Sequence, residues 1–239
     1  MLTTTNPAIL YFGTPVVLVS SLNSDGSANL APMSSAWWLG WRCMLGFGAR
    51  SATPQNILRT GECVLNLPSA AMTSIVDRLA LTTASDPVPE FKQKRGYRHE
   101  AQKFERAELT PVPSEVVAPP RALECPIQLE ARLTDSHRIA EDNAAIRGNL
   151  VALEVEIVRV HADSSILVPG DRDRIDPDKW RPLIMSFQHF YGLTPRLQES
   201  TLATIPESAY RPKTAGSVEE MVGADKQLRD QRNGVKCQA

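Results

Sequence analysis

Apolar and polar residues alternate in short runs along the first part of the chain, which is the pattern of β-strands rather than of long helices. The segment TPVVLVSSLNSDGSANLAPMS contains a β-branched run over residues 16–20, a polar turn at Asp25 and Gly26, and an extended run from Ala28. These features predict a β-hairpin. The next segment, AWWLGWRCMLGFG, is apolar with glycines that disfavour a helix, so we expect a third extended segment with imperfect alternation.

Helical signals occur in two of the segments that follow. In TPQNILRTGECVLNLP, Thr53 can cap a helix, Pro54 suits a first helical position, and Gly61 marks the end of a short helix. A strand over residues 63–67 should come next. In SAAMTSIVDRLAL the apolar residues recur at helical spacing, with Ser69 as a candidate cap.

Residues 82–120 form an excursion that is rich in proline and charge and poor in aliphatic residues, with room for one short helix. A stretch of this length favours a functional lid or a partner-facing loop on the rim of the fold. A nucleic-acid surface could use its basic and aromatic residues, but a solvated helix or a loop that meets an anionic small molecule fits a nearly neutral chain better. The basic residues of this excursion are Lys92, Lys94, Arg95, Arg98, Lys103 and Arg106.

Two long alternating segments, over residues 127–133 and 150–160, predict adjacent antiparallel strands. SSILVPGDRDRIDPDKWRP reads as a loop and LIMSF as a short strand, and weak helical character follows over residues 218–229. The sum predicts a mainly β protein, of the all-β class, whose barrel carries a few peripheral helices. We expect one domain over residues 1–210 and a polar C-terminal tail over residues 211–239.

The composition narrows the possible partners and location. The 26 basic and 27 acidic residues give a net charge of -1, which argues against a nucleic-acid partner. The chain has neither a secretory signal nor an apolar run of membrane-spanning length, so we expect a cytoplasmic protein with no membrane partner. Its four cysteines form no C-x-x-C pair, and we expect Cys43 and Cys63 to be reduced and buried.

Several familiar site motifs are absent from the sequence. GFGARS has Ser51 where a dinucleotide fingerprint would have its third glycine, and neither a phosphate-binding P-loop nor a G-x-S-x-G elbow occurs. The four histidines lack ligand spacing, so we expect no metal centre. We assign no catalytic side chain.

The stretch GARSATPQNILRTGE combines anion-binding groups with the expected start of a helix, where backbone N–H groups are unpaired. Arg50 supplies a permanent cation, and Ser51, Thr53 and Asn56 add short donors, a combination that suits a phosphate. Taken alone, these cues favour a plain helix cap with a surface arginine slightly more, because caps are far commoner than ligand sites.

A second polar set, Asn29, Ser34 and Ser35, lies in the otherwise apolar stretch NLAPMSSAWW, where Pro32 marks a strand edge or a break. Unpaired backbone groups there could face a planar heterocycle, and a bulge with two satisfied serines is an equally common explanation. The three tryptophans over residues 37–41 are typical of a core or a subunit interface, and a stacking platform for a ring ligand is the rarer alternative.

The blocks NLAPMSS, RSATPQNI and GECVLN resemble, in order and spacing, the flavin reductase-like family, whose fold is the FMN-binding split barrel. The late segments GNLVALEVEIVRVH and RPLIMSFQHFYGL also resemble its closing strands, so the resemblance covers most of residues 15–193. The family pattern often has a Lys-Asp pair where this chain has Ser51 and Ala52, and we therefore expect one phosphate or ribityl contact to differ.

The resemblance implies a set of cofactor contacts and an activity. It implies an oxidoreductase in which hydride passes from NAD(P)H to flavin N5 and on to a small-molecule or protein acceptor, within a homodimer. An FMN-binding electron carrier or flavin-storage protein without its own nicotinamide turnover is the alternative, and a barrel that has lost its flavin is a weaker one. By the resemblance, the FMN phosphate is held by Arg50, Ser51, Thr53 and Asn56, and the ribityl chain and pyrimidine edge are met by Asn29, Ala31, Ser34 and Ser35.

Overall fold

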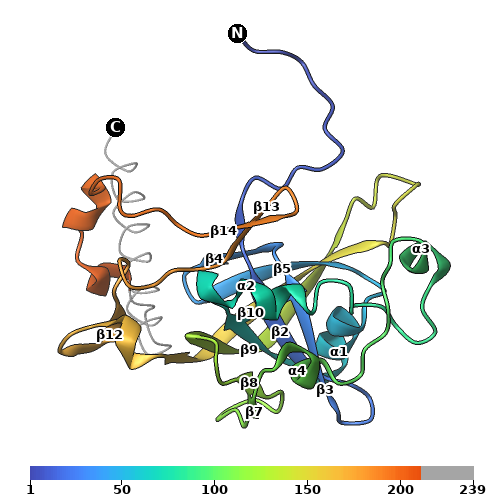
Figure 1. Ribbon diagram of the computed structural model, residues 1–239, viewed down its shortest axis with the longest axis horizontal. Coiled ribbons are helices and arrows are strands. Elements are labelled where there is room, and N and C mark those ends of the chain that lie inside the picture. The colour runs from blue at the N-terminus through green and yellow to red at the C-terminus, as the bar shows by residue number, and fades with distance from the viewer. Residues whose placement is uncertain (211–239) are drawn as a thin grey trace, which may run out of the picture. The chain divides into compact units, whose positions relative to one another are not determined.

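A computed structural model of the chain describes residues 1–210, and the expected tail over residues 211–239, with its helical stretch, lies outside the described residues. Contacts divide the chain after Leu197. The architecture of residues 1–197 is mainly β with a few short helices, which confirms the predicted fold class (Figure 1).

One antiparallel sheet of seven strands dominates the fold. Its two edge strands, β3 and β4, are consecutive in the chain and are joined by Ser34 and Ser35 alone, so the sheet has to curl until its edges approach each other. The result is a barrel that is split between β3 and β4. In spatial order the strands are β3 (Ala28–Met33), β2 (Val17–Leu22), β6 (Glu62–Leu67), β9 (Ile127–Ile139), β10 (Leu150–Ala162), β5 (Arg42–Gly48) and β4 (Ala36–Leu39).

Shorter elements decorate this barrel. The helices are α1 (Ala52–Thr60), α2 (Thr73–Asp77), α3 (Glu90–Gln93) and α4 (Lys103–Ala107), with 3-10 turns at Ala70–Met72 and Ser164–Ile166, and at Thr201–Thr204 and Glu207–Tyr210 beyond Leu197. A three-stranded sheet contains β1 (Thr14–Pro15), β13 (Ile184–Ser186) and β14 (His189–Tyr191). Two-stranded pairs join β7 (Pro111–Val112) to β8 (Arg121–Ala122) and β11 (Leu167–Val168) to β12 (Asp171–Ile175).

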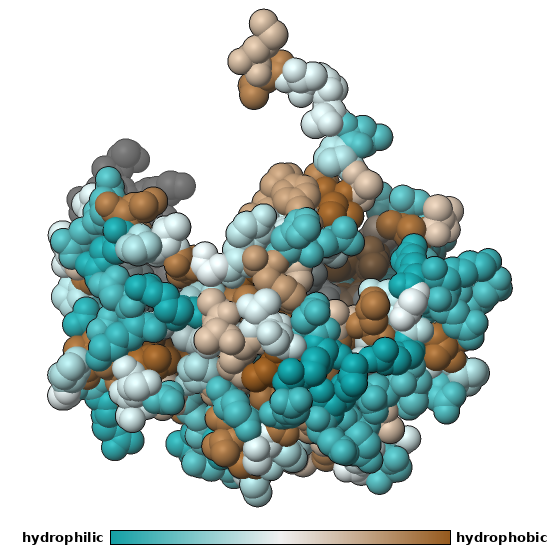
Figure 2. All heavy atoms as spheres, viewed as in Figure 1, coloured by the Kyte–Doolittle hydropathy of each residue, from teal (hydrophilic) through white to brown (hydrophobic). Residues whose placement is uncertain are grey.

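Polar side chains cover much of the face seen in Figure 2, and apolar ones gather around the β13–β14 hairpin. Near this hairpin, the Phe12 and Phe187 rings stack edge to face with centroids 5.1 Å apart. β1, which pairs with β13, also contacts β4. On β4 the Trp37 and Leu39 side chains are 57% and 74% exposed, so apolar surface continues along this barrel edge.

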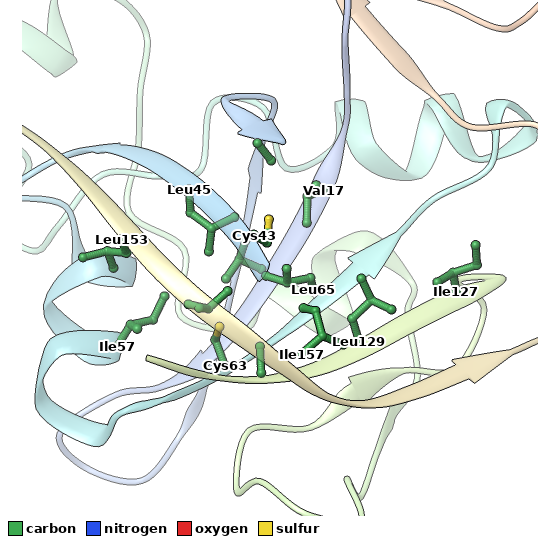
Figure 3. Packing of buried hydrophobic residues seen from close by; sticks show 14 of the residues in the cluster. Val17, Cys43, Leu45, Ile57, Cys63, Leu65, Ile127, Leu129, Leu153 and Ile157 are labelled. Atoms are coloured by element: carbon green, nitrogen blue, oxygen red, sulfur yellow. The ribbon is translucent and has the colours of Figure 1, made fainter. Parts of the chain in front are cut away.

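Alternation along β2 divides the apolar interior into two clusters. Val17 and Val19 point into the barrel, where Figure 3 shows side chains from β5, β6, β9, β10 and α1 directed toward one another. Leu18 faces the other way, toward a second cluster that α2 and α4 cover. Cys43 and Cys63 are fully buried in the barrel, as predicted, and burial raises the pKa of the Cys43 thiol to about 12. Both therefore serve as small apolar side chains.

The structure corrects three expectations about elements. The expected third extended segment is two strands, β4 and β5, because the chain reverses at Gly40, whose φ is +57°. The turn explains why the alternation of apolar and polar residues in this segment is imperfect. The expected loop before LIMSF contains β11 and β12, and the excursion over residues 82–120 contains two short helices rather than one.

Candidate functional site

The start of α1 lies beside the β2–β3 hairpin and forms the base of the candidate site. Ser51 is the N-cap, with an extended backbone at φ -74° and ψ 152°, so the helix begins before the predicted cap Thr53. Pro54 is tolerated in this first turn because its missing N–H would have no helical partner there. At the other end Gly61 adopts the left-handed conformation and donates its N–H to the Ile57 carbonyl at 2.8 Å, as its position predicted.

Buried amide and hydroxyl groups tie this helix to the hairpin. The Asn29 side-chain amide donates to the hydroxyls of Ser21 and Thr53, each at 3.1 Å. The Asn56 amide donates to the Ser21 hydroxyl at 3.2 Å and to the Asn23 side-chain oxygen at 3.0 Å. Asn29 from one polar set thus bonds to Thr53 from the other and shares the Ser21 hydroxyl with Asn56, although the two sets lie in different parts of the sequence. Ser21, which the sequence analysis did not single out, lies at their centre.

A lysine from the excursion completes this cluster. Lys103, the first residue of α4, is 6% exposed, and its ammonium donates to the Asn29 side-chain oxygen at 2.7 Å. Burial, together with the nearby charge of Lys92, lowers the pKa of Lys103 to about 8, although the charge of Glu100 opposes the change. Lys103 was one of several basic residues noted in the excursion, and only its burial distinguishes it from the others.

The polar groups at the start of α1 that have no partner, or have a proton still to donate, can all act as hydrogen-bond donors. Within the described residues, the backbone N–H groups of Ala52 and Thr53 have no acceptor, and the Ser51 hydroxyl makes no capping bond. The Thr53 hydroxyl accepts from Asn29 and retains its own proton to donate. Arg50 is exposed, and it makes no ion pair or hydrogen bond with any residue that the structure describes. Such a set of donors suits a phosphate group.

The remaining predicted residues, Ala31, Ser34 and Ser35, lie along the split of the barrel. Ala31 is buried in β3, Ser34 is half-buried and Ser35 is exposed in the β3–β4 connection. The Ser35 carbonyl accepts the Gly46 N–H at 2.8 Å, and a Cβ atom built on Gly46 would lie 3.1 Å from the Ser35 Cβ. Glycine at this position in β5 therefore lets the connection lie close to the strand that leads into Arg50. In the described structure these three side chains make no hydrogen bond to the buried cluster.

Comparison with known proteins agrees with this architecture. The family model described as flavin reductase like domain matches residues 9–194. The uncharacterized protein YdfE of Bacillus subtilis (strain 168) is 37% identical over 187 residues, which cover 78% of this chain and 87% of YdfE.

Two solved structures show the same fold. Flavoredoxin of Desulfovibrio vulgaris (Miyazaki F) has a TM-score of 0.67 at 22% identity, over 85% of this chain and 100% of that one. Nitrilotriacetate monooxygenase component B from Bacillus cereus has a TM-score of 0.66 at 18% identity, over 83% of this chain and 100% of the other. At these identities the likeness establishes the fold alone.

Proposed function

Because this chain belongs to the flavin reductase-like domain family, we propose that it binds FMN at the start of α1 and acts as an oxidoreductase that uses NAD(P)H. The observation that carries the proposal is the concentration of free donors at that helix, beside a buried cluster that contains Lys103. A dianionic phosphate is the kind of group that such donors bind.

Each part of the site would have a distinct task. Arg50, Ser51 and Thr53 would bind the phosphate. Asn56 makes its amide bonds within the protein and would act by fixing the helix against the hairpin. Asn29 likewise holds Thr53 in place from β3. Ala31, Ser34 and Ser35 would face the ribityl chain and the pyrimidine edge of the flavin, along the split of the barrel.

When bound, the flavin supplies the redox chemistry, taking hydride from NAD(P)H at N5 and passing the electrons to a small-molecule or protein acceptor. The protein has to hold the ring system at a fixed position and leave one face open to the nucleotide. Positioning of this kind requires no side-chain acid or base, so no residue is assigned a catalytic role.

We also propose that the protein is a homodimer whose interface includes the apolar edge on β4. Trp37 and Leu39 are more than half exposed there, and Trp41 is 46% exposed in the turn that follows. Large apolar side chains gathered at a sheet edge are typical of an interface. The β3–β4 connection with Ser34 and Ser35 directly precedes this strand, so a partner covering it would also border the flavin site.

The test is an absorbance spectrum of the purified protein with added FMN, followed by anaerobic NADH and, separately, NADPH. Free FMN at the same concentration is the control. Flavin bands that bleach only in the presence of protein support the oxidoreductase, and the faster nucleotide is its electron donor. If FMN binds but its absorbance bands persist after either nucleotide is added, the protein is an electron carrier rather than an oxidoreductase that uses NAD(P)H. A protein that takes up no flavin would overturn the proposal.

A further inference from the structure

The turn of the β13–β14 hairpin consists of two residues that are poorly suited to its backbone. Ser186 and His189 are the last paired residues of the two strands, so Phe187 and Gln188 alone form the turn. Both have positive φ angles, +44° and +69°. A two-residue turn of this kind favours asparagine and glycine, because larger side chains are strained in the left-handed region. The chain therefore has a large aromatic residue at a position where stability alone favours a smaller one.

Contacts with the segment before β1 hold the Phe187 ring in place at the surface. The Phe187 backbone N–H donates to the Tyr11 carbonyl at 2.9 Å, and the Ser186 hydroxyl donates to the same carbonyl at 3.3 Å. The Phe12 and Phe187 rings pack edge to face, and both side chains are exposed. Backbone strain that presents a positioned side chain in this way is typical of functional sites.

This hairpin lies beside the ring end of the proposed flavin site. β13 pairs with β1, in the segment that leads into β2. The ladder between β2 and β3 ends with Val17 opposite Met33, so the residues just before Val17 run alongside the β3–β4 connection. β1 also contacts β4. Phe12 and Phe187 therefore border the connection that contains Ser34 and Ser35, where the flavin ring is proposed to lie.

The two segments that carry these rings are uncharged over a long stretch. Residues 2–16 and 182–195 contain no Asp, Glu, Lys or Arg, and His189 is their one histidine. An acceptor that bears phosphates or carboxylates would find no ionic partner on these segments. An uncharged planar ring, by contrast, can stack on exposed aromatic side chains.

We propose that Phe12 and Phe187 form the acceptor subsite, and that they select an uncharged planar aromatic acceptor of the quinone class. This inference rests on the proposed function. The quinone takes up two electrons and two protons and becomes a hydroquinone, while the flavin that NAD(P)H had reduced returns to its oxidised form. In the balanced reaction NAD(P)H supplies a hydride and solvent supplies one proton. The subsite therefore determines the choice of acceptor and leaves flavin affinity unchanged.

The test compares two acceptors in FMN-loaded wild type and Phe187→Asn. One is menadione, an uncharged two-ring quinone, and the other is ferricyanide, a highly charged metal complex that cannot stack. Asparagine suits the left-handed turn and removes the ring, so the variant should fold. We expect kcat/KM for menadione to fall by about tenfold, while kcat/KM for ferricyanide and the rate of flavin bleaching by NAD(P)H change less than about twofold.

Gln188→Gly is the matched control, because it relieves strain in the same turn and keeps the ring. It should raise the unfolding temperature by about 2 °C and leave menadione reduction unchanged. Equal losses for both acceptors in Phe187→Asn, no loss for menadione, or a comparable loss in Gln188→Gly would overturn the subsite. Light scattering should give Phe187→Asn the mass of the wild type, and a smaller mass would show that the hairpin contacts a second copy instead.

Failure of the proposed function looks different, because neither nucleotide would then bleach the flavin of the wild-type protein. If the flavin bleaches and its electrons pass to ferricyanide but not to menadione, the protein is still an oxidoreductase that uses NAD(P)H. That result would overturn the quinone subsite alone.

Discussion

Arg50 and Lys103 are two cations of different kinds beside the same helical turn, one exposed and one buried. Replacing exposed Arg50 by alanine should weaken FMN binding by about three- to tenfold, and the loss should shrink at high salt because ions screen an exposed charge. Titrations of FMN and riboflavin at low and high salt check this. Arg196→Ala removes an arginine paired with Asp178 instead, and should have no effect. Unchanged FMN affinity of Arg50→Ala at low salt would contradict the assignment.

Glu130 is a buried carboxylate whose task is structural. It accepts the backbone N–H groups of Glu115 and Val116 at 2.8 and 2.7 Å, and the His161 ring nitrogen lies 2.7 Å away, so it clamps the end of the excursion to β9. Burial raises the pKa of Glu130, but these partners together outweigh burial and hold the pKa below its usual value.

A lowered pKa in the folded state means that Glu130 stabilises the fold above its unfolded-state pKa, and that this contribution is lost as the pH falls. Glu130→Gln should therefore lower the free energy of unfolding by about 2 kcal/mol at pH 7, with a smaller difference near pH 4. Urea unfolding at both pH values measures this. Exposed Glu105→Gln is the control, and an equal difference at the two pH values would contradict the clamp.

At the scale of elements, the β3–β4 connection depends on a glycine in β5. Gly46→Val would push Ser35 away, because even a single Cβ atom would lie 3.1 Å from the Ser35 Cβ. If Ser34 and Ser35 contact the ring end of the flavin, the affinities for FMN and riboflavin should both fall by about fivefold. This loss corresponds to roughly 1 kcal/mol of binding free energy, caused by displacement of the β3–β4 connection. Titration with both flavins checks this, with thermal unfolding to confirm the fold. A loss confined to FMN would contradict it.

The elements that the sequence predicted well are those with local signals. The strands near residues 63–67 and 150–160 alternate along their own length, and Gly61 ends α1 because the left-handed conformation there suits glycine. The turn at Gly40 was missed because its flanking residues are as apolar as the strands themselves. The start of α1 was misplaced by two residues, since Ser51 and Thr53 are both good caps.

The candidate site could be predicted only in part, for the same physical reason. Arg50, Ser51 and Thr53 are neighbours in the sequence, so their joint chemistry is visible without a fold. The burial of Lys103 depends on α4 docking against β3, which no local pattern encodes. The amide bonds of Asn29 and Asn56 likewise arise from contacts between separate elements, and they show these side chains fixing the site from behind.

At the scale of the whole molecule, the curled sheet leaves two edges that no further strand of the main sheet covers. α4 packs against β3, and its Lys103 bonds to Asn29 of that strand. β4 instead presents Trp37 and Leu39 beside β1. One edge strand thus packs against a helix of this chain, whereas the other contacts the short β1 and still exposes large apolar side chains. That asymmetry supports the proposed homodimer, since an uncovered sheet edge is prone to association.

The dimer can be tested through Leu39, whose side chain is 74% exposed on β4. Leu39→Glu should disrupt a dimer formed through this edge, because a carboxylate would be buried without a partner, at a cost of several kcal/mol for the two copies together. Light scattering behind size exclusion should give twice the chain mass for wild type and the chain mass for the variant. Leu123→Glu, at a leucine that is 56% exposed elsewhere, should remain dimeric. Because Ser34 and Ser35 directly precede β4, the monomeric variant should also bind both flavins more weakly. A wild-type monomer, or a Leu39→Glu dimer, would show that this edge is not the interface.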